Sequence, residues 1–179
     1  MISDLIIIDN VFENVQEIIE QFNKTEMFNR LENEESYLEQ WCGYRSHNLY
    51  KYNPELIQKS INTILKKTLN SKNYNNHSFE WKGDAVFHLL EDSPKQNDSW
   101  FHKDSVTMAC IVYLNEDAQK NSGTEIIIND EKKIVENKFN RAVIYNARLM
   151  HAAQGGFGRG RNSRLTLNIF IDELTINIR

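Results

Sequence analysis

Two side chains that can bind a metal ion, His102 and Asp104, stand one residue apart just before the apolar segment VTMACIVYL. In an extended chain, residues i and i+2 point to the same side, so this imidazole and this carboxylate can converge on one ion. The pair alone is weak evidence, because a sequence of this composition contains about 0.25 such pairs by chance. A third ligand must come from elsewhere, and His151, just past the strand-like run RAVIYN, is the best candidate.

The other three histidines fit a metal site less well. His47 and His77 lie in polar, loop-like sequence. His88 lies inside the run AVFHLL, where a core histidine with its own hydrogen-bond partners is the better interpretation.

The set of His102, Asp104 and His151 is open to three interpretations. Two neutral imidazoles and one carboxylate form the facial triad typical of non-haem iron(II) sites, which leaves coordination positions open for a chelating cosubstrate and O₂. The same groups can hold Zn²⁺ for hydrolysis, with water in the open position. The third interpretation is a sheet edge without a metal. The three residues alone favour none of these over the others.

A run near the C-terminus, RLTLNIFI, alternates between apolar and mostly polar residues. One face carries Leu165, Leu167, Ile169 and Ile171, and the other carries Arg164, Thr166, Asn168 and Phe170. The ordinary interpretation is a half-exposed strand with one polar face. The alternative directs Arg164 into the mouth of a barrel, where its rigid guanidinium would bind a carboxylate. Such an arginine suits a dicarboxylic acid that chelates the metal at its other end.

The composition and charge limit the class of protein. A length of 179 residues predicts one domain, residues 1–179, with a core of its own. The net charge of -4 argues against a nucleic acid or an anionic membrane as the main partner. Cys42 and Cys110 make no disulfide framework, which predicts a reducing, cytoplasmic setting. The apolar run LIII is too short for a signal peptide or a membrane span.

Residues 1–78 predict a mixed, mostly helical support. DLIIID predicts a short strand, and apolar residues at helical spacing follow it: Val15, Ile18, Ile19 and Phe22. Asn53 and Pro54 predict a helix start, with Asn at the cap and Pro at the first helical position. An apolar stripe continues that helix toward the predicted loop NSKNYNN. Between the helices, WCGYRS (residues 41–46) predicts a turn.

Residues 79–179 predict an antiparallel β structure. Short β-branched and aromatic runs follow one another, separated by turn residues: FEW, DAVFHLLE, VTMACIVYL, TEIIIN, KKIVE, RAVIYN, RLTLNIFI and LTINI. No long helical stripe lies between them, which argues against a parallel sheet built with crossover helices. The predicted fold class is therefore mainly β, a double-stranded β-helix (jelly roll), with the N-terminal helices packed on one outer sheet face.

The order of these motifs resembles that of the iron(II)- and 2-oxoglutarate-dependent dioxygenases, and most closely their prolyl-hydroxylase-like branch. The motifs HKD, IVYLN, SGTEI, VIYNARLMH and RLTLNIF occur in the family's order over residues 84–172. The resemblance implies that His102, Asp104 and His151 bind Fe(II). It also implies that Arg164 pairs with the distal carboxylate of the cosubstrate 2-oxoglutarate, that O₂ is the oxidant, and that Tyr113 donates its hydroxyl to the same carboxylate. Thr166 is a further candidate for this pocket.

Two features depart from the family's pattern. Strict alternation from Asp104 would put Tyr113 on the opposite face, so a break is required between them, and DSVT is the candidate. The family's usual spacing from the distal His places the basic residue at Arg161, whereas strand alternation assigns Arg164. The glycine-rich segment GGFGRGRNS accounts for the difference as an inserted mobile loop over the mouth of the site.

The predicted function is an Fe(II)- and 2-oxoglutarate-dependent dioxygenase that hydroxylates a substrate. The resemblance to prolyl hydroxylases favours a peptidyl or free amino acid, although the sequence does not identify the substrate. Two alternatives remain open at this point: a non-catalytic jelly-roll binding module and a zinc hydrolase. The hydrolase lacks an evident Glu near His102 or His151 to act as a base.

Overall fold

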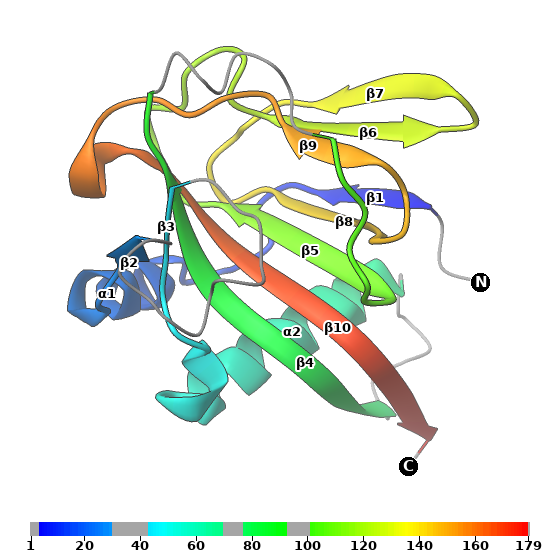
Figure 1. Cartoon of the computed structure of the whole chain (residues 1–179). Coiled ribbons are helices and arrows are strands. Elements are labelled where there is room, and N and C mark those ends of the chain that lie inside the picture. Colours follow the sequence, from blue (N-terminus) through cyan, green and yellow to red (C-terminus); the bar gives the residue numbers. More distant parts are fainter. Residues whose placement is uncertain (1–3, 30–42, 70–76, 93–100, 179) are drawn as a thin grey trace.

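A computed structural model describes residues 4–29, 43–69, 77–92 and 101–178 of the chain. Figure 1 shows its elements, which are in chain order β1 (Leu5–Ile8), α1 (Gln16–Lys24), β2 (Phe28–Asn29), β3 (Tyr44–Arg45), η2 (Leu49–Lys51), α2 (Pro54–Thr68), β4 (His77–Leu90), β5 (Met108–Tyr113), β6 (Thr124–Ile128), β7 (Glu131–Val135), β8 (Ala142–Asn146), β9 (His151–Ala153), η4 (Gly160–Asn162) and β10 (Arg164–Ile178).

The strands form two antiparallel sheets. The larger sheet has the order β1-β8-β5-β10-β4-β3-β2, and the smaller sheet has the order β7-β6-β9. Side chains of both sheets meet in a shared apolar layer, in which Ile126 and Val135 of the smaller sheet pack with Tyr113, Val143 and Tyr145 of the larger one. Two facing sheets with this strand order confirm the predicted jelly roll.

The helices α1 and α2 cover the other face of the larger sheet (Figure 1). The helical residues Ile18, Phe22 and Ile61 belong to one buried cluster with Leu167 and Ile169 of β10. These two β10 residues come from the apolar face predicted for RLTLNIFI. The predicted placement of the helices on one outer sheet face is therefore confirmed.

Helix α2 begins where the sequence predicts. The side chain of Asn53 accepts a hydrogen bond from the backbone N–H of Leu56 at 3.2 Å, and Pro54 occupies the first helical position. The amide group of Asn53 also donates to Gln21 of α1 at 3.0 Å. The cap residue of α2 therefore also joins the two helices.

The two longest strands differ from the prediction of separate short ones. FEW and DAVFHLLE form the single strand β4, and RLTLNIFI and LTINI form the single strand β10, which pairs with β4 along its length. A register shift between Ile171 and Glu173 bends β10 without ending it. At Gly83 a Cβ atom would lie only 1.9 Å from the carbonyl oxygen of Phe170, so this glycine permits the close approach of the two strands.

Three short strands were not predicted. Residues 44 and 45 of WCGYRS form β3 rather than a turn, although Trp41 and Cys42 lie outside the described residues. The strands β2 and β9 have two and three residues, too few to produce a periodic pattern.

The glycine-rich segment, residues 155–163, packs away from the mouth of the site. Phe157 is buried, and its backbone N–H donates to Leu90 at the end of β4. The guanidinium of Arg161 donates to the carbonyl oxygens of Phe22 and Thr25, at 3.0 and 2.8 Å, at the C-terminal end of α1. The expectation of a loop over the site is wrong, because these contacts hold the segment against α1.

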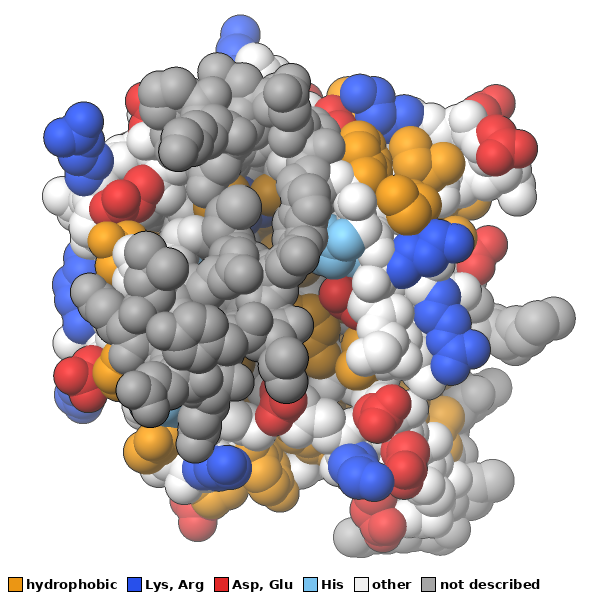
Figure 2. All heavy atoms as spheres, viewed as in Figure 1, with side chains coloured by type: hydrophobic (Ala, Val, Ile, Leu, Met, Phe, Trp, Pro, Cys, Tyr) orange, Lys and Arg blue, Asp and Glu red, His pale blue; other side chains and the backbone are white. Residues whose placement is uncertain are grey.

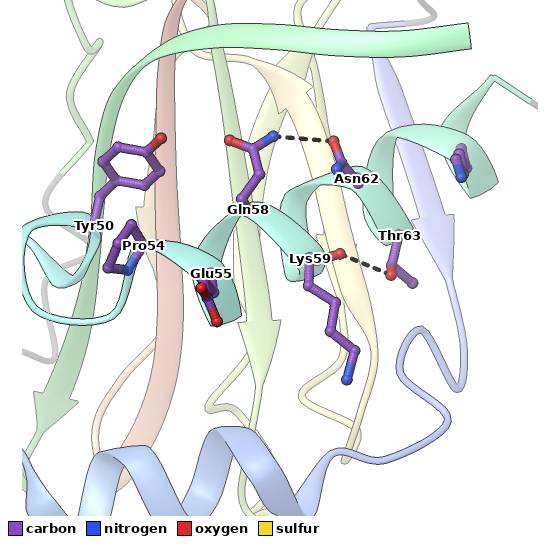
Figure 3. Close-up of a pocket in the computed structure, with 8 residues that line it drawn as sticks. Tyr50, Pro54, Glu55, Gln58, Lys59, Asn62 and Thr63 are labelled. Atoms are coloured by element: carbon purple, nitrogen blue, oxygen red, sulfur yellow. Dashed lines mark hydrogen bonds between the residues drawn. The ribbon is translucent and has the colours of Figure 1, made fainter. Parts of the chain in front are cut away.

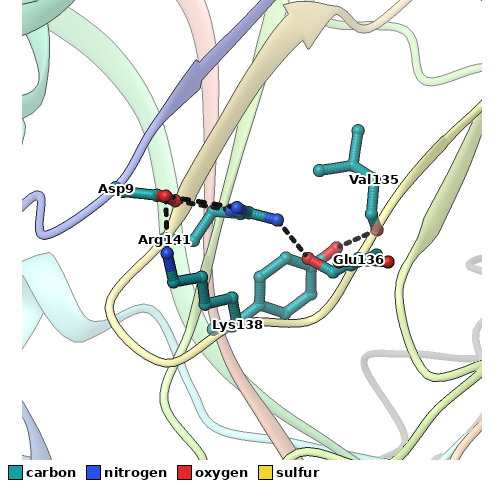
Figure 4. A network of polar contacts seen from close by, with 6 residues as sticks. Asp9, Val135, Glu136, Lys138 and Arg141 are labelled. Carbon is teal, nitrogen blue, oxygen red and sulfur yellow. Dashed lines mark hydrogen bonds and ion pairs between the residues drawn. The ribbon is translucent and has the colours of Figure 1, made fainter.

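A polar network holds β1 to the turn before β8. Figure 4 shows Asp9 between Arg141 and Lys138. Arg141 binds the carboxylate through Nε at 2.6 Å and Nη2 at 3.2 Å, and Lys138 binds it at 2.7 Å. The hydrogen bonds from Arg141 and then Lys138 hold the pKa of Asp9 well below its usual range.

Neither helix in the described part of the chain is long and apolar enough to cross a membrane.

Candidate metal centre and cosubstrate pocket

A cavity of about 70 Å³ lies between the two sheets. The predicted metal ligands and Arg164 line it together with residues of β3, β4, β5, β6, β8 and β10. In the face viewed in Figure 2, a histidine and an acidic side chain lie next to one another beside a hollow with hydrophobic atoms in its floor. The cavity therefore brings together groups from distant parts of the sequence.

The three predicted ligands lie together. One ligand atom from each of His102, Asp104 and His151 lies within 4.8 Å of the others. The Nε2 atoms of His102 and His151 lie 3.5 and 3.4 Å from the two carboxylate oxygens of Asp104. Ligands held about 2.1 Å from one ion at right angles to each other lie about 3 Å apart, so this spacing suits a shared metal ion.

The polar atoms of His151 and Asp104 are arranged in a way that suits a bound cation. The Nδ1 atom of His151 lies 2.9 Å from the carbonyl oxygen of Leu149, which makes Nδ1 the protonated nitrogen and leaves the Nε2 lone pair available. The Oδ2 atom of Asp104 is buried and has no hydrogen-bond partner among the residues that the structure describes. A buried carboxylate oxygen without a donor is costly unless a cation satisfies it, so the donor set fits a divalent metal.

Backbone pairing fixes the three ligands in place. His102 and His151 exchange two backbone hydrogen bonds, at 3.0 and 2.9 Å, as an isolated antiparallel bridge. The backbone N–H of Asp104 donates to Ala147 at 2.9 Å. The ring of Tyr145, in β8, packs against that of His151 with centroids 4.8 Å apart. This tyrosine lines the cavity. It was not predicted from the sequence to be a site residue, because it lies within an apolar run that is typical of a buried strand.

The strand β5 begins only at Met108, after a bend at residues 105–107. This is the break expected in DSVT. It allows Ala109 and Tyr113 to face the smaller sheet although Asp104 lies an odd number of residues before Tyr113.

Arg164 is buried at the end of the cavity near the smaller sheet. Its Nε donates to the carbonyl oxygen of Ser122 at 2.5 Å and its Nη2 to that of Gly123 at 3.2 Å. Burial lowers the pKa of the guanidinium, and the nearby Tyr113 opposes this effect. Among the described residues no carboxylate forms an ion pair with Arg164. A buried cation without an anion is energetically costly, so this position would be stabilised by a bound anion.

Tyr113 and Thr166 are buried beside Arg164 but do not themselves line the cavity. The Tyr113 ring lies 5.5 Å from the Arg164 guanidinium carbon, and its hydroxyl shares a 2.6 Å hydrogen bond with that of Thr124, which does line the cavity. Burial raises the pKa of Tyr113, so the phenol stays protonated. The Thr166 hydroxyl lies 3.5 Å from the carbonyl oxygen of His88.

His88 was wrongly assigned to the core. Its neighbours Phe87 and Leu89 point into the buried cluster beneath the helices, so alternation along β4 turns His88 to the opposite face, where it lines the cavity. His47 packs against the ring of Phe28 and has no part in the site, and the side chain of His77 lies outside the described residues.

A larger hollow, of about 620 Å³, runs along the outer side of α2 (Figure 3). Tyr50 and Pro54 line one end, and polar side chains such as Gln58 and Asn62 line the rest, joined by a 3.1 Å hydrogen bond. Within the described part of the chain, it brings together no group of His, Cys, Asp or Glu side chains that could hold a metal ion. The smaller cavity between the sheets therefore remains the candidate site.

Comparison with solved structures places this fold among those of known oxygenases. The non-haem α-ketoglutarate-dependent epimerase SnoN from nogalamycin biosynthesis matches with a TM-score of 0.63 at 11% identity, over 99% of this chain and 79% of that one. HygX from Streptomyces hygroscopicus, with nickel and 2-oxoglutarate bound, matches with a TM-score of 0.60 at 11% identity, over 96% of this chain and 83% of that one.

A prolyl hydroxylase from Trichoplax adhaerens, in complex with a peptide fragment of hypoxia inducible factor, matches with a TM-score of 0.62 at 10% identity, over 94% of this chain and 83% of that one. No family model matches the sequence, and no curated protein matches it in sequence. The chain therefore has the fold of the 2-oxoglutarate- and Fe(II)-dependent oxygenases, with less than 15% identity to these examples.

Proposed function

We propose that this protein is an Fe(II)- and 2-oxoglutarate-dependent dioxygenase that hydroxylates a peptidyl or free amino acid. The observation that carries the proposal is one cavity with two charged groups that have no Lys, Arg, Asp or Glu partner of opposite charge among the described residues. These are the buried, unsatisfied Oδ2 of Asp104 beside two imidazoles, and the buried guanidinium of Arg164 without a carboxylate. The first suits a metal ion and the second suits an organic acid.

His102, Asp104 and His151 would hold the iron, which together with 2-oxoglutarate and O₂ supplies the oxidation of a substrate C–H bond. Arg164 would bind the distal carboxylate of 2-oxoglutarate, since its planar fork matches two carboxylate oxygens. The protonated Tyr113 hydroxyl shares one hydrogen bond with Thr124, and on binding it would turn its single proton to the same carboxylate while the Thr124 hydroxyl donates to it. Thr166 lies on the same strand between Arg164 and Asn168 and, although it does not itself line the cavity, would pack beside the bound carboxylate end of 2-oxoglutarate.

The apolar walls have a separate role. Buried residues of both sheets, such as Ile126 and Val143, form an apolar cluster with Tyr145, which lines the cavity, so one side of the site would be shielded from water. Exclusion of water strengthens the attraction between Arg164 and an anion, because the local dielectric constant is low.

The rival functions have less support. Asp104 is the only carboxylate among the described residues that line the cavity, so a zinc hydrolase would have no second carboxylate to activate a bound water. A binding module without catalysis has no use for an open metal triad beside a buried arginine. The two cysteines form no disulfide framework, which supports a cytoplasmic setting for the activity.

The proposal is tested by calorimetric titration of 2-oxoglutarate into the protein with and without Mn²⁺. We expect the metal to raise the affinity for 2-oxoglutarate at least tenfold, because the keto acid chelates it. Glutarate is the matched control, since it keeps both carboxylates but lacks the keto group, and its affinity should gain much less. Equal affinity for 2-oxoglutarate with and without metal would contradict the proposal.

A further inference from the structure

The asparagine of the motif IVYLN, Asn115, has no role in the function proposed above, although it contacts the chain on both sides of Arg164. Its Nδ2 group donates to the carbonyl oxygen of Ser163 at 2.9 Å. Its Oδ1 accepts a hydrogen bond from the backbone N–H of Leu165 at 2.6 Å. One carboxamide thus holds the two residues that flank Arg164.

The Asn115 side chain takes the place of a strand partner at this position. β5 pairs with β10 only as far as Thr166, and Arg164 lies beyond that last pair. A carboxamide carries the same donor and acceptor as a peptide group, so it can bond to both backbone groups that β5 would otherwise pair. Ser163 and Leu165 are both buried, and buried backbone groups need a partner. Loss of the carboxamide would therefore release the chain on both sides of the arginine.

The position of the Arg164 backbone matters because the guanidinium can face a carboxylate in one direction only. Its Nε donates to the carbonyl oxygen of Ser122 and its Nη2 to that of Gly123, so the edge between these two nitrogens is occupied. Only the edge formed by Nη1 and Nη2 can then offer two parallel N–H groups to a carboxylate. A displacement of the Arg164 backbone would turn this edge away or break the hydrogen bonds to the two carbonyl groups.

We infer that Asn115 is a positioning residue of the cosubstrate pocket. By fixing the chain on both sides of Arg164, it holds the guanidinium in the direction in which it binds the distal carboxylate of 2-oxoglutarate. Asn115 does not itself line the cavity, so it acts through Arg164. The inference rests on the proposed function, because it requires Arg164 to bind this carboxylate. An arginine that is already ordered loses less conformational freedom on binding, which increases the affinity.

The experiment compares 2-oxoglutarate with pyruvate, a keto acid that lacks the distal carboxylate, by calorimetric titration of the full chain loaded with Mn²⁺. Both can chelate the metal, but only 2-oxoglutarate can also reach Arg164. Asn115→Ala should weaken the binding of 2-oxoglutarate about tenfold, since the arginine must then be ordered when the carboxylate binds. The affinities for pyruvate and for Mn²⁺ should stay within about twofold. Asn115→Gln keeps the carboxamide and should retain more affinity for 2-oxoglutarate than Asn115→Ala.

Asn53→Ala is the matched control. It also removes a carboxamide that accepts a hydrogen bond from a backbone N–H and donates to a neighbour, but this asparagine lies in the helical layer, on the other side of the larger sheet. The affinities of Asn53→Ala for both keto acids should match those of the wild type. Asn115→Ser, which keeps a short polar side chain, gives the same comparison if Asn115→Ala does not fold.

The two keto acids separate this inference from the proposed function. A loss confined to 2-oxoglutarate supports the inference, because a general distortion of the fold would weaken both keto acids. An unchanged affinity for 2-oxoglutarate in the folded Asn115 variant, or an equal loss for pyruvate, would overturn the inference while the proposed function stands. A wild-type protein that binds 2-oxoglutarate equally with and without Mn²⁺ would reject the proposed function, and the inference with it.

Discussion

At the scale of single residues, Asp104 has a carboxylate whose surroundings suit a bound cation. Its carboxylate lies between two imidazoles, with Oδ2 buried and unsatisfied. Such a group gains more from a bound cation than from any neighbour among the described residues. Metal binding should therefore appear as a gain in the stability of the folded protein.

The first prediction concerns this gain. Fe(II) at a hundred times its dissociation constant stabilises a folded protein by about 2.7 kcal/mol, which for a chain of this size raises the melting temperature by roughly 5–10 °C. Asp104→Asn should remove this rise while the metal-free variant melts close to the wild type, because Asn keeps the shape of the side chain. Anaerobic calorimetric melting measures both. The exposed Asp117→Asn is the control, and a variant that still gains the full rise would exclude Asp104 as a ligand.

The second prediction compares the two arginines. Removing Arg164, the proposed buried partner of the distal carboxylate of 2-oxoglutarate, should cost about 3–5 kcal/mol, and each 1.4 kcal/mol corresponds to about tenfold in affinity. Arg164→Ala should therefore weaken 2-oxoglutarate at least a hundredfold. Arg161→Ala, which loses contacts to α1 only, should change the affinity a few-fold at most. Titration of the anaerobic iron protein measures both, and the reverse order of effects would assign the carboxylate to Arg161.

The sequence predicts some residues of this cavity and misses others for physical reasons. Arg164 and Asn168 follow from strand alternation in one continuous run, and the proposed metal ligands are recognisable by residue type and spacing. The position of Arg45 cannot be predicted in this way, because β3 has only two residues and its place beside the cavity depends on its pairing with β4. Thr124 reaches the cavity through the facing sheet, and the distance between two sheets is not encoded in local periodicity.

At the scale of secondary-structure elements, the cap of α2 determines how the helical layer lies on the larger sheet. Asn53 satisfies a free N–H of α2 and donates to Gln21 of α1. Both helices cover the face of β4 and β10 opposite to the cavity, so they support the site without contacting it.

The third prediction tests this support. Asn53→Ala should lower the free energy of unfolding by about 1 kcal/mol, because it removes the cap. Asn53→Asp should recover most of the loss, since its carboxylate can still accept the hydrogen bond from Leu56. Urea unfolding gives both values. A loss of 2-oxoglutarate affinity in folded Asn53→Ala would show that the helices influence the site more directly than the packing implies.

The strands illustrate what local patterns omit. Every predicted run over residues 79–178 falls on a strand. The sequence, however, predicts that strands end near Gly83 and near Asp172, whereas in the structure β4 and β10 continue past these positions. A glycine and a bulge change the direction of a strand, and only the pairing partner decides whether hydrogen bonding continues beyond them.

At the scale of the whole molecule, the Asp9 network ties the N-terminal strand to the jelly roll (Figure 4). β1 is an edge strand of the larger sheet and pairs with β8 alone. Arg141 precedes β8 directly, so its ion pair with Asp9 fixes β1 at the end where the chain leaves the sheet.

The fourth prediction follows from the lowered pKa of Asp9. A carboxyl group whose pKa is lower in the folded state contributes stability above its unfolded pKa, about 3.9, and this contribution is lost as the pH falls below it. Asp9→Asn should lower stability by at most about 1 kcal/mol at pH 7, because the pair is partly exposed. The difference from the wild type should shrink below about pH 4. Denaturant unfolding between pH 2 and 7 tests this, and a difference that grows toward low pH would contradict it.

The central claim for the molecule is that one cavity holds Fe(II) and 2-oxoglutarate in direct contact. The most direct measurement adds 2-oxoglutarate to the anaerobic Fe(II) protein and follows the visible charge-transfer band of the chelate. We expect a band that saturates with 2-oxoglutarate in the wild type and is absent in folded Asp104→Ala and His151→Ala variants. No band in the wild type at saturating reagents, or an unchanged band in both variants, would contradict it.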